Sequence, residues 1–232
     1  MILLRDFKRA LMHLAFPHVC TGCGSDCLEA DIYLCLRCQL LLPETHFHLH
    51  ADNSMEKAFW GRVPIVAATA QYYFSNKSLM QHLLHEFKYR KHVKLGFYLG
   101  QLMGYALLES GRFNSIDSIV PLPLHPKKQS RRGFNQAEIL SNGIAGILEK
   151  PVLTEAVMRT TDVESQTRKS RIERWQNMDG IFKLKDDSLI KEQHVLLVDD
   201  VMTTGATLEA CSGILLDSSC TISMACLCYT SS

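Results

Sequence analysis

The chain has 232 residues, of which 47% are hydrophobic and 21% charged, and its formal net charge is +1. This length and composition fit one folded domain with a sizeable core and a small appendage, and the charge excludes nucleic-acid binding that depends on a global basic excess. No apolar run approaches the roughly 20 residues of a membrane-spanning helix, so we expect no membrane span.

The first element along the chain is "MILLRDFKRALMHLAF", Met1 to Phe16, whose apolar residues recur at helical spacing. The charged residues that follow Leu4 interrupt any signal-peptide core, so we expect a cytoplasmic protein. We expect this helix to pack on the body of the protein; a position on a membrane surface is the alternative.

Two C-x-x-C pairs follow, Cys20 with Cys23 and Cys35 with Cys38, and eleven residues separate them. Four thiolates at this spacing predict one tetrahedral zinc site, which would be structural because no coordination position is left for water. A redox dithiol or a disulfide pair is the alternative interpretation, and Cys27 is an alternative ligand. We therefore expect a zinc-ribbon-like module, with the first helix, over residues 1–50.

A polar, histidine-rich stretch, "HFHLHADN" from His46 to Asn53, comes next. We interpret it as a solvated loop, since the two cysteine pairs already supply a full set of zinc ligands. A linker is expected over residues 51–62, and one further domain over residues 63–232.

The pattern from residue 63 onward is that of an α/β domain. Apolar runs predict strands over residues 64–74, 115–124, 151–158, 194–199 and 221–229. Apolar residues at helical spacing predict helices over 79–87, 95–107, 135–148 and 206–216. Strands without polar alternation that alternate with helices indicate a parallel sheet covered on both faces.

The stretch "VLLVDDVMTTGATL", Val195 to Leu208, joins a buried strand, two adjacent acids, a hydroxyl-rich loop and a helix start. Ligands bind at the carboxyl edge of a parallel sheet, and a helix amino terminus attracts phosphate. The acids repel phosphate and suit sugar hydroxyls or Mg²⁺, so the pattern predicts a ribose 5-phosphate site. The alternative is that the acids cap a turn and the loop is an ordinary connection.

This stretch resembles the phosphoribosyl pyrophosphate signature of type I phosphoribosyltransferases, and nearly the whole chain resembles the ComF family of that superfamily. The further matching segments are "PLPLHPKKQSRRGFNQAEIL" from Pro121, "SQTRKSRIERWQNMDGIF" from Ser165 and the four-cysteine module. Arg168 and Lys169 stand where the family pattern has a Gly-Leu pair. The resemblance implies a type I phosphoribosyltransferase core that binds phosphoribosyl pyrophosphate with Mg²⁺.

The resemblance also implies a role for each motif. Asp199 and Asp200 would be the catalytic acids that hold the ribose hydroxyls. The 5-phosphate would be held by Thr203, Thr204, Gly205, Ala206 and Thr207. The pyrophosphate loop would comprise Leu122, Pro123, Leu124 and His125, with Arg131 and Arg132 neutralising charge. A lid that excludes water would be formed by Ser165, Gln166, Thr167, Arg168, Lys169 and Arg171.

Two functions of different classes follow from these motifs. The first is transfer of a phosphoribosyl group to an acceptor that the sequence does not identify. The second, implied by the family's association with natural competence, is a module that handles incoming single-stranded DNA, with a competence helicase or other uptake proteins as candidate partners. The basic clusters from Lys88 to Lys94 and from Lys127 to Arg132 are the candidate DNA contacts, although the first is more typical of a solvated helix end.

Overall fold

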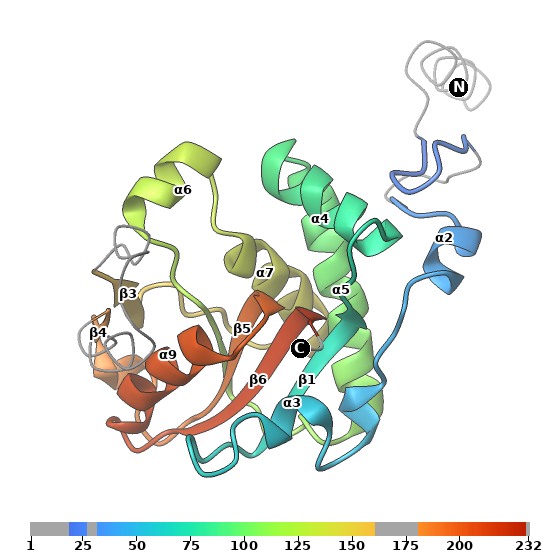
Figure 1. Ribbon diagram of the computed structural model, residues 1–232. Helices are drawn as coiled ribbons and strands as arrows, with labels where there is room; N and C mark the ends of the chain where they lie inside the picture. The colour runs from blue at the N-terminus through green and yellow to red at the C-terminus, as the bar shows by residue number, and fades with distance from the viewer. Residues whose placement is uncertain (1–18, 27–31, 161–180, 231–232) are drawn as a thin grey trace, which may run out of the picture.

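Four parallel strands form the central sheet in a computed structural model, which describes residues 19–26, 32–160 and 181–230. The strands lie in the order β1 (Ala67–Tyr73), β6 (Thr221–Tyr229), β5 (His194–Met202) and β2 (Ser118–Pro121) (Figure 1). β5 and β6 are paired along eight positions, from His194 opposite Thr221 to Met202 opposite Tyr229. The predicted α/β architecture with a parallel sheet is confirmed.

Helices cover both faces of this sheet, as Figure 1 shows. One face packs against α4 (Leu79–Tyr89), α5 (Val93–Ser110) and α7 (Gln136–Leu148), and the other against α3 (Ser54–Lys57) and α9 (Ala206–Leu216). In β5, Leu196 and Val198 belong to the first core, whereas Val195 and Leu197 belong to the second. Because both faces of β5 are buried, its sequence is continuously apolar instead of alternating.

Close packing between α5 and α7 is made possible by glycine. A Cβ atom at Gly100 would lie 2.4 Å from the backbone oxygen of Leu140, and one at Gly143 would lie 2.3 Å from the oxygen of Phe97. No larger residue fits at either position, so the two backbones lie nearly in contact. This fixes the position of α7, whose amino terminus faces the carboxyl edge of the sheet.

The small elements include one correction to the sequence prediction. The strand expected over residues 151–158 is not a strand of the main sheet: only Val152 forms a bridge there, with Ile119. The exposed residues Thr154 and Glu155 then turn the chain away, and β3 (Val157–Arg159) pairs antiparallel with β4 (Phe182–Leu184) in a separate sheet. The remaining short elements are α2 (Leu36–Leu40), η1 (Phe47–Leu49), α6 (Pro126–Arg132) and η3 (Asp187–Leu189).

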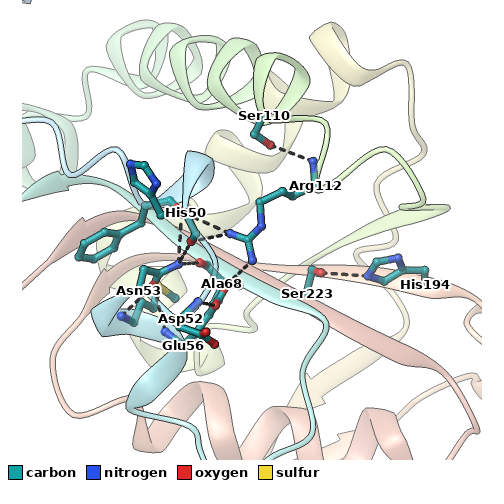
Figure 2. A network of polar contacts seen from close by, with 11 residues as sticks. His50, Asp52, Asn53, Glu56, Ala68, Ser110, Arg112, His194 and Ser223 are labelled. Atoms are coloured by element: carbon teal, nitrogen blue, oxygen red, sulfur yellow. Dashed lines mark hydrogen bonds and ion pairs between the residues drawn. The ribbon is translucent and has the colours of Figure 1, made fainter.

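The stretch expected to be a solvated loop is instead packed against β1. Phe47, His48 and Asn53 are each more than nine-tenths buried. The Asn53 side chain donates to the backbone oxygens of Phe47, His50 and Ala68 and accepts from two amides of α3, as Figure 2 shows in part. Its polar groups are satisfied by backbone atoms, which is why a polar sequence can be buried here.

A buried ion pair holds the same segment to the body of the domain. Arg112, which precedes β2, lies 2.6 Å from a carboxylate oxygen of Glu56 in α3 (Figure 2). Glu56 also accepts hydrogen bonds from the amides of Ala68 and Asp52, and Arg112 donates to the oxygen of His50. Residues 51–62 are thus tied to β1 and to the loop before β2 by side chains that are mostly out of solvent.

Three expectations fall outside the described residues: the helix over Met1 to Phe16, the alternative ligand Cys27, and the lid from Ser165 to Arg171. Within the described part of the chain, every helix is too short or too polar to cross a bilayer.

Candidate functional site

The two adjacent acids lie at the carboxyl edge of the sheet, as the sequence indicated. β5 continues through them to Met202, and both side chains are half-buried. The Asp200 carboxylate lies 2.7 Å from the Nζ atom of Lys88, in the last turn of α4, and only 17% and 14% of the Lys88 and Asp200 side chains is exposed. The Asp200 amide donates to Asp199 Oδ1 at 2.7 Å. One acid is thus paired with a cation and the other with a backbone amide.

The environment of Asp199 changes the protonation behaviour of its carboxyl group. Burial, and next the negative charge of Asp200, raise the pKa of Asp199 to about 7. The Asp200 amide and the charges of Lys88 and Arg159 oppose this shift without cancelling it. Near neutral pH, Asp199 is therefore divided between its neutral and charged forms, so it can either donate or accept a hydrogen bond.

The acids line an open pocket of about 180 Å³. Three cations, Lys88, Arg132 and Arg159, line it together with the two carboxylates, so the pocket carries a net positive charge. Such a pocket suits a ligand that combines anionic groups with hydroxyls. The complete lining is Lys88, Leu122, Pro123, Leu124, Arg132, Asn135, Gln136, Ala137, Arg159, Asp199, Asp200 and Thr207.

The segment expected to form a pyrophosphate loop follows β2 directly into this pocket. The side-chain amide of Asn135 donates a hydrogen bond to the backbone oxygen of Leu122 at 3.1 Å. The side-chain oxygen of Asn135 accepts a hydrogen bond from the amide of Ala137, at the start of α7. Asn135 therefore joins the loop to the helix. His125 lies outside the lining and caps α6, its Nδ1 atom accepting from the amide of Lys127 at 3.2 Å.

The structure distinguishes the two arginines that follow this loop. Arg132 lines the pocket, donates to Gln136 Oε1 at 2.8 Å and lies with its guanidinium 6.0 Å from the ring centre of Tyr89. Arg131 is exposed and does not line the pocket. Of the pair, Arg132 is the one that can contact a ligand in this conformation.

The loop Thr203–Thr207 connects β5 to α9 beside the acids. Gly205, which caps α9, has φ of 75°, and a Cβ atom there would lie 2.9 Å from the Phe59 ring. Both the left-handed backbone and the close contact require glycine. Thr207 lines the pocket, whereas Thr203 and Thr204 are exposed at its margin.

Several pocket residues were not identified from the sequence. Lys88 belongs to a basic cluster whose sequence is more typical of a solvated helix end, and for this residue the solvated interpretation is wrong. Arg159, whose guanidinium lies 5.5 Å from the ring centre of Phe182, comes from the small sheet that was not predicted. Asn135 carried a usable signal, because it is the first residue of an expected helix and asparagine is a preferred capping residue.

A second candidate site is the cysteine cluster. The Sγ atoms of Cys20, Cys23, Cys35 and Cys38 all lie within 4.8 Å of one another, and those of Cys23 and Cys35 are 3.7 Å apart. Four sulfurs around one tetrahedral zinc at bond lengths near 2.3 Å would be about 3.8 Å apart. The geometry is compatible with structural zinc.

Backbone amides also support a thiolate at this cluster. The amide of Cys35 donates to Cys20 Sγ at 3.2 Å. Burial acts to raise the pKa of Cys20, but the amides of Cys35, Cys23 and Gly22 outweigh it and lower the pKa to about 7. A lowered thiol pKa favours the form that binds metal.

The cluster packs against α4, the helix that supplies Lys88. His82 Nε2 lies 2.9 Å from the backbone oxygen of Thr21, and a Cβ atom at Gly22 would lie 3.0 Å from the Leu79 side chain. Cys20 and Cys38 are members of the same buried core as α4 and α5. The two candidate sites therefore lie near opposite ends of one helix.

Comparison with known proteins gives consistent similarities. Residues 130–232 match the phosphoribosyl transferase domain family. The DNA utilization protein YhgH of Shigella flexneri is 30% identical over 226 residues, 94% of this chain and 94% of that protein. Competence protein F of Haemophilus influenzae is 29% identical over 89% of this chain and 88% of its own length. Competence protein ComFC of Bacillus subtilis is 34% identical over 99 residues, 43% of this chain and 38% of that protein.

The raised pKa of Asp199 predicts a stability gain when its charge is removed. Between the pKa of an unfolded aspartate, about 4, and about 7, the folded protein holds a proton that the unfolded chain has released, so stability falls as pH rises through this window. Asp199→Asn should therefore stabilise the protein at about pH 8, by on the order of 2 kcal/mol, and the gain should shrink toward about pH 4. Denaturant titrations at both pH values measure it.

A suitable control for this measurement is Asp217→Asn, because Asp217 is exposed at the end of α9. It should change stability little at either pH. An Asp199→Asn protein that is no more stable than the wild type at about pH 8 would contradict the conclusion that burial and the charge of Asp200 disfavour the charged form of Asp199.

Proposed function

We propose that this chain, which belongs to the ComF family of the type I phosphoribosyltransferase superfamily, binds phosphoribosyl pyrophosphate in the pocket at the carboxyl edge of its sheet. The observation that carries the proposal is the combination, in one pocket, of two adjacent acids, three cations and a glycine-capped helix start. The acids suit a diol, the cations suit phosphate groups, and the loop suits a terminal phosphate.

In this arrangement Asp199 and Asp200 hold the two ribose hydroxyls. Asp200, which is paired with Lys88, accepts hydrogen bonds, while Asp199 accepts or donates according to its protonation. The 5-phosphate is held by the amides and hydroxyls of the loop Thr203–Thr207. No protein nucleophile is needed, because departure of pyrophosphate leaves an oxocarbenium-like ribosyl group that nearby carboxylates stabilise.

The pyrophosphate is placed against Leu122–Leu124, with Arg132 and Arg159 as the nearby cations. Mg²⁺ bound to it would neutralise charge on the leaving group. The Asp200 carboxylate is already paired with Lys88. The residues present therefore fit a metal ion that the pyrophosphate would hold, and not one that the protein carboxylates would bind. The Ser165–Arg171 lid of the sequence prediction would exclude water, and the acceptor of the ribosyl group is not identified.

We place this activity in competence or DNA utilization, on the basis of the names of the similar proteins. Binding without transfer is the other form of the proposal: the same pocket would then act as a sensor or docking point for phosphoribosyl pyrophosphate in a protein that handles single-stranded DNA. A competence helicase or other uptake proteins are proposed partners in that case.

Direct contact with single-stranded DNA is supported by the position of the two basic clusters. A Cβ atom at Gly133, which ends α6, would lie 3.5 Å from Lys91 Nζ, so the turn after α4 reaches α6. Tyr89, 62% exposed, lies between the clusters and against Arg132. We propose that the clusters act as one basic ridge beside the pocket, which comprises Arg90, Lys91, Lys94, Lys127, Lys128 and Arg131.

Structural zinc is the third part of the proposal. The four cysteines would hold one ion as thiolates, with no open position for catalysis. The ion would supply folding energy to residues 19–42 and, through the shared core, to the first turn of α4.

The phosphoribosyl pyrophosphate site is tested by substituting both acids. The protein should bind phosphoribosyl pyrophosphate with Mg²⁺ in a calorimetric titration, and Asp199→Asn with Asp200→Asn should weaken binding about a hundredfold or more, because two hydrogen bonds to charged groups are lost. Asp217→Asn is the matched control. Unchanged affinity in the double variant would rule the site out.

A pyrophosphate-release assay with the wild-type protein then distinguishes a transferase from a binding module. Pyrophosphate release is followed with Mg²⁺, phosphoribosyl pyrophosphate and a mixture of nucleobases or cell extract. Release that requires an acceptor supports the enzyme, while binding without release supports the sensor.

The basic ridge predicts salt-dependent binding of single-stranded DNA. Fluorescence anisotropy should show affinity that falls with salt, and Lys91→Glu with Lys127→Glu should weaken binding and reduce the salt slope by about 2, one per phosphate contact. Lys191→Glu, on the exposed turn before β5 and so at the opposite edge of the sheet, should have little effect. Absence of binding at low salt, or indifference to the ridge substitutions, removes direct DNA contact.

Zinc is measured by elemental analysis of protein purified without chelator, which should give one ion per chain. Removing the zinc ion should speed amide exchange in residues 19–42 and in the first turn of α4, because these segments depend on the cysteine cluster. The amides of β5 and β6 should stay protected. Metal-free protein with unchanged exchange in α4 would contradict the proposed role.

A further inference from the structure

Arg62 connects three segments around the loop Thr203–Thr207, although Thr204 lies 142 positions further along the chain. Its Nη1 atom donates to the backbone oxygen of Ala58 at 2.9 Å and to that of Thr204 at 3.4 Å. Its Nη2 atom forms an ion pair with Glu209, in the first turn of α9. The guanidinium also lies 6.0 Å from the ring centre of Phe59, which packs beneath Gly205.

The contact with Thr204 sets the direction of the next amide. The peptide bond between Thr204 and Gly205 is trans, as are all peptide bonds described here. In a planar trans peptide the C=O and N–H groups point to opposite sides. Because the Thr204 oxygen faces Arg62, the Gly205 N–H faces away from Arg62.

The contact with Glu209 removes a local electrostatic conflict. The first turn of α9 attracts anions through its free amides and helix dipole, but a carboxylate in the same turn repels a second anion. The Glu209 amide donates to the oxygen of Gly205 at 2.9 Å, so its residue is fixed directly beside the loop. Arg62 neutralises this carboxylate, and the side chains are only 33% and 18% exposed, so solvent screens the pair incompletely.

The segment that carries Arg62 is itself rigidly attached. Asn53 and Glu56, at the start of α3, are buried and bonded to Ala68 and Arg112 (Figure 2). Phe59 is fully buried, and the amide of Arg62 donates to its oxygen at 2.9 Å. Arg62 therefore extends from a fixed support, not from a free loop.

We infer that Arg62 is a positioning residue for phosphate binding: it orients the Gly205 amide and neutralises Glu209, so that the loop Thr203–Thr207 accepts the 5-phosphate of a ribose ligand. The inference rests on the proposed function for its ligand. Arg62 does not touch that ligand; it acts through the loop.

The test compares the ligand affinities of four variants. Three are the single variants Arg62→Met, Arg62→Lys and Glu209→Gln, and the fourth is the double variant Arg62→Met with Glu209→Gln. Arg62→Met should weaken binding of both phosphoribosyl pyrophosphate and ribose 5-phosphate about tenfold, the effect of one lost charge-assisted interaction. Glu209→Gln should not weaken binding by itself. In the Arg62→Met background it should raise the affinity for both ligands about threefold, because the carboxylate that repels the phosphate is gone. The affinity of Arg62→Lys should be intermediate, since lysine keeps the positive charge but not the planar guanidinium group that donates several hydrogen bonds at once.

Two controls isolate the effect. Lys57→Met removes the same charge from the same segment at an exposed residue that contacts Trp60, and should leave binding unchanged. Amide exchange of the ligand-free protein gives a readout independent of any ligand: in Arg62→Met the amides of Thr203–Leu208 should exchange faster while those of β6 stay protected.

The outcomes separate this inference from the proposed function. If wild-type protein binds neither ligand, the proposed function fails and the ligand role of Arg62 fails with it. If wild-type protein binds and Arg62→Met binds equally well, or its loop amides exchange at the wild-type rate, the inference alone is overturned. If Glu209→Gln recovers nothing, charge neutralisation is wrong.

Discussion

The arrangement depends on one constraint: two adjacent carboxylates lie near the carboxyl end of β5, directly after a segment that is buried on both faces. Their mutual repulsion and burial raise the pKa of Asp199 and would make the strand end unfavourable if nothing compensated. The compensation comes from Lys88 on Asp200 and from the Asp200 amide on Asp199. A strand selected only for stability would carry apolar residues here, as β5 does at Val195–Val198, and the proposed ligand role would account for the two acids.

Glycine packing determines which elements can reach those acids. Because α5 and α7 lie backbone to backbone at Gly100 and Gly143, α7 begins at the carboxyl edge, where Asn135 holds Leu122. α4 packs in the same core and ends at Lys88. The pocket is therefore assembled from the ends of helices whose positions are fixed in the core, and its shape does not rely on side-chain contacts at the surface alone.

The sequence predicted the parts of this structure whose signals are local. Continuous apolar runs gave the parallel strands, and the succession of strand, acids and loop placed Asp199, Asp200 and Thr207 at one edge. It did not reveal Lys88 or Arg62, because each is defined by a contact with a residue more than one hundred positions away, Asp200 and Thr204 respectively. The His46–Asn53 stretch misled for another reason: its polar composition is typical of a solvated loop, yet Asn53 is satisfied by backbone oxygens and so can be buried.

The division between cysteine module and α/β domain, natural in the sequence, is not a division in the packing of the described residues. Cys20, Leu34 and Cys38 share one hydrophobic core with α4 and α5, and Tyr33 packs edge to face on His92, at the start of α5. α4 spans 11 residues, about 16 Å of helix, from Leu79 beside the cysteines to Tyr89 beside Arg132. α4 thus carries a contact with the cysteine cluster in its first turn and the contact between Lys88 and Asp200 in its last turn.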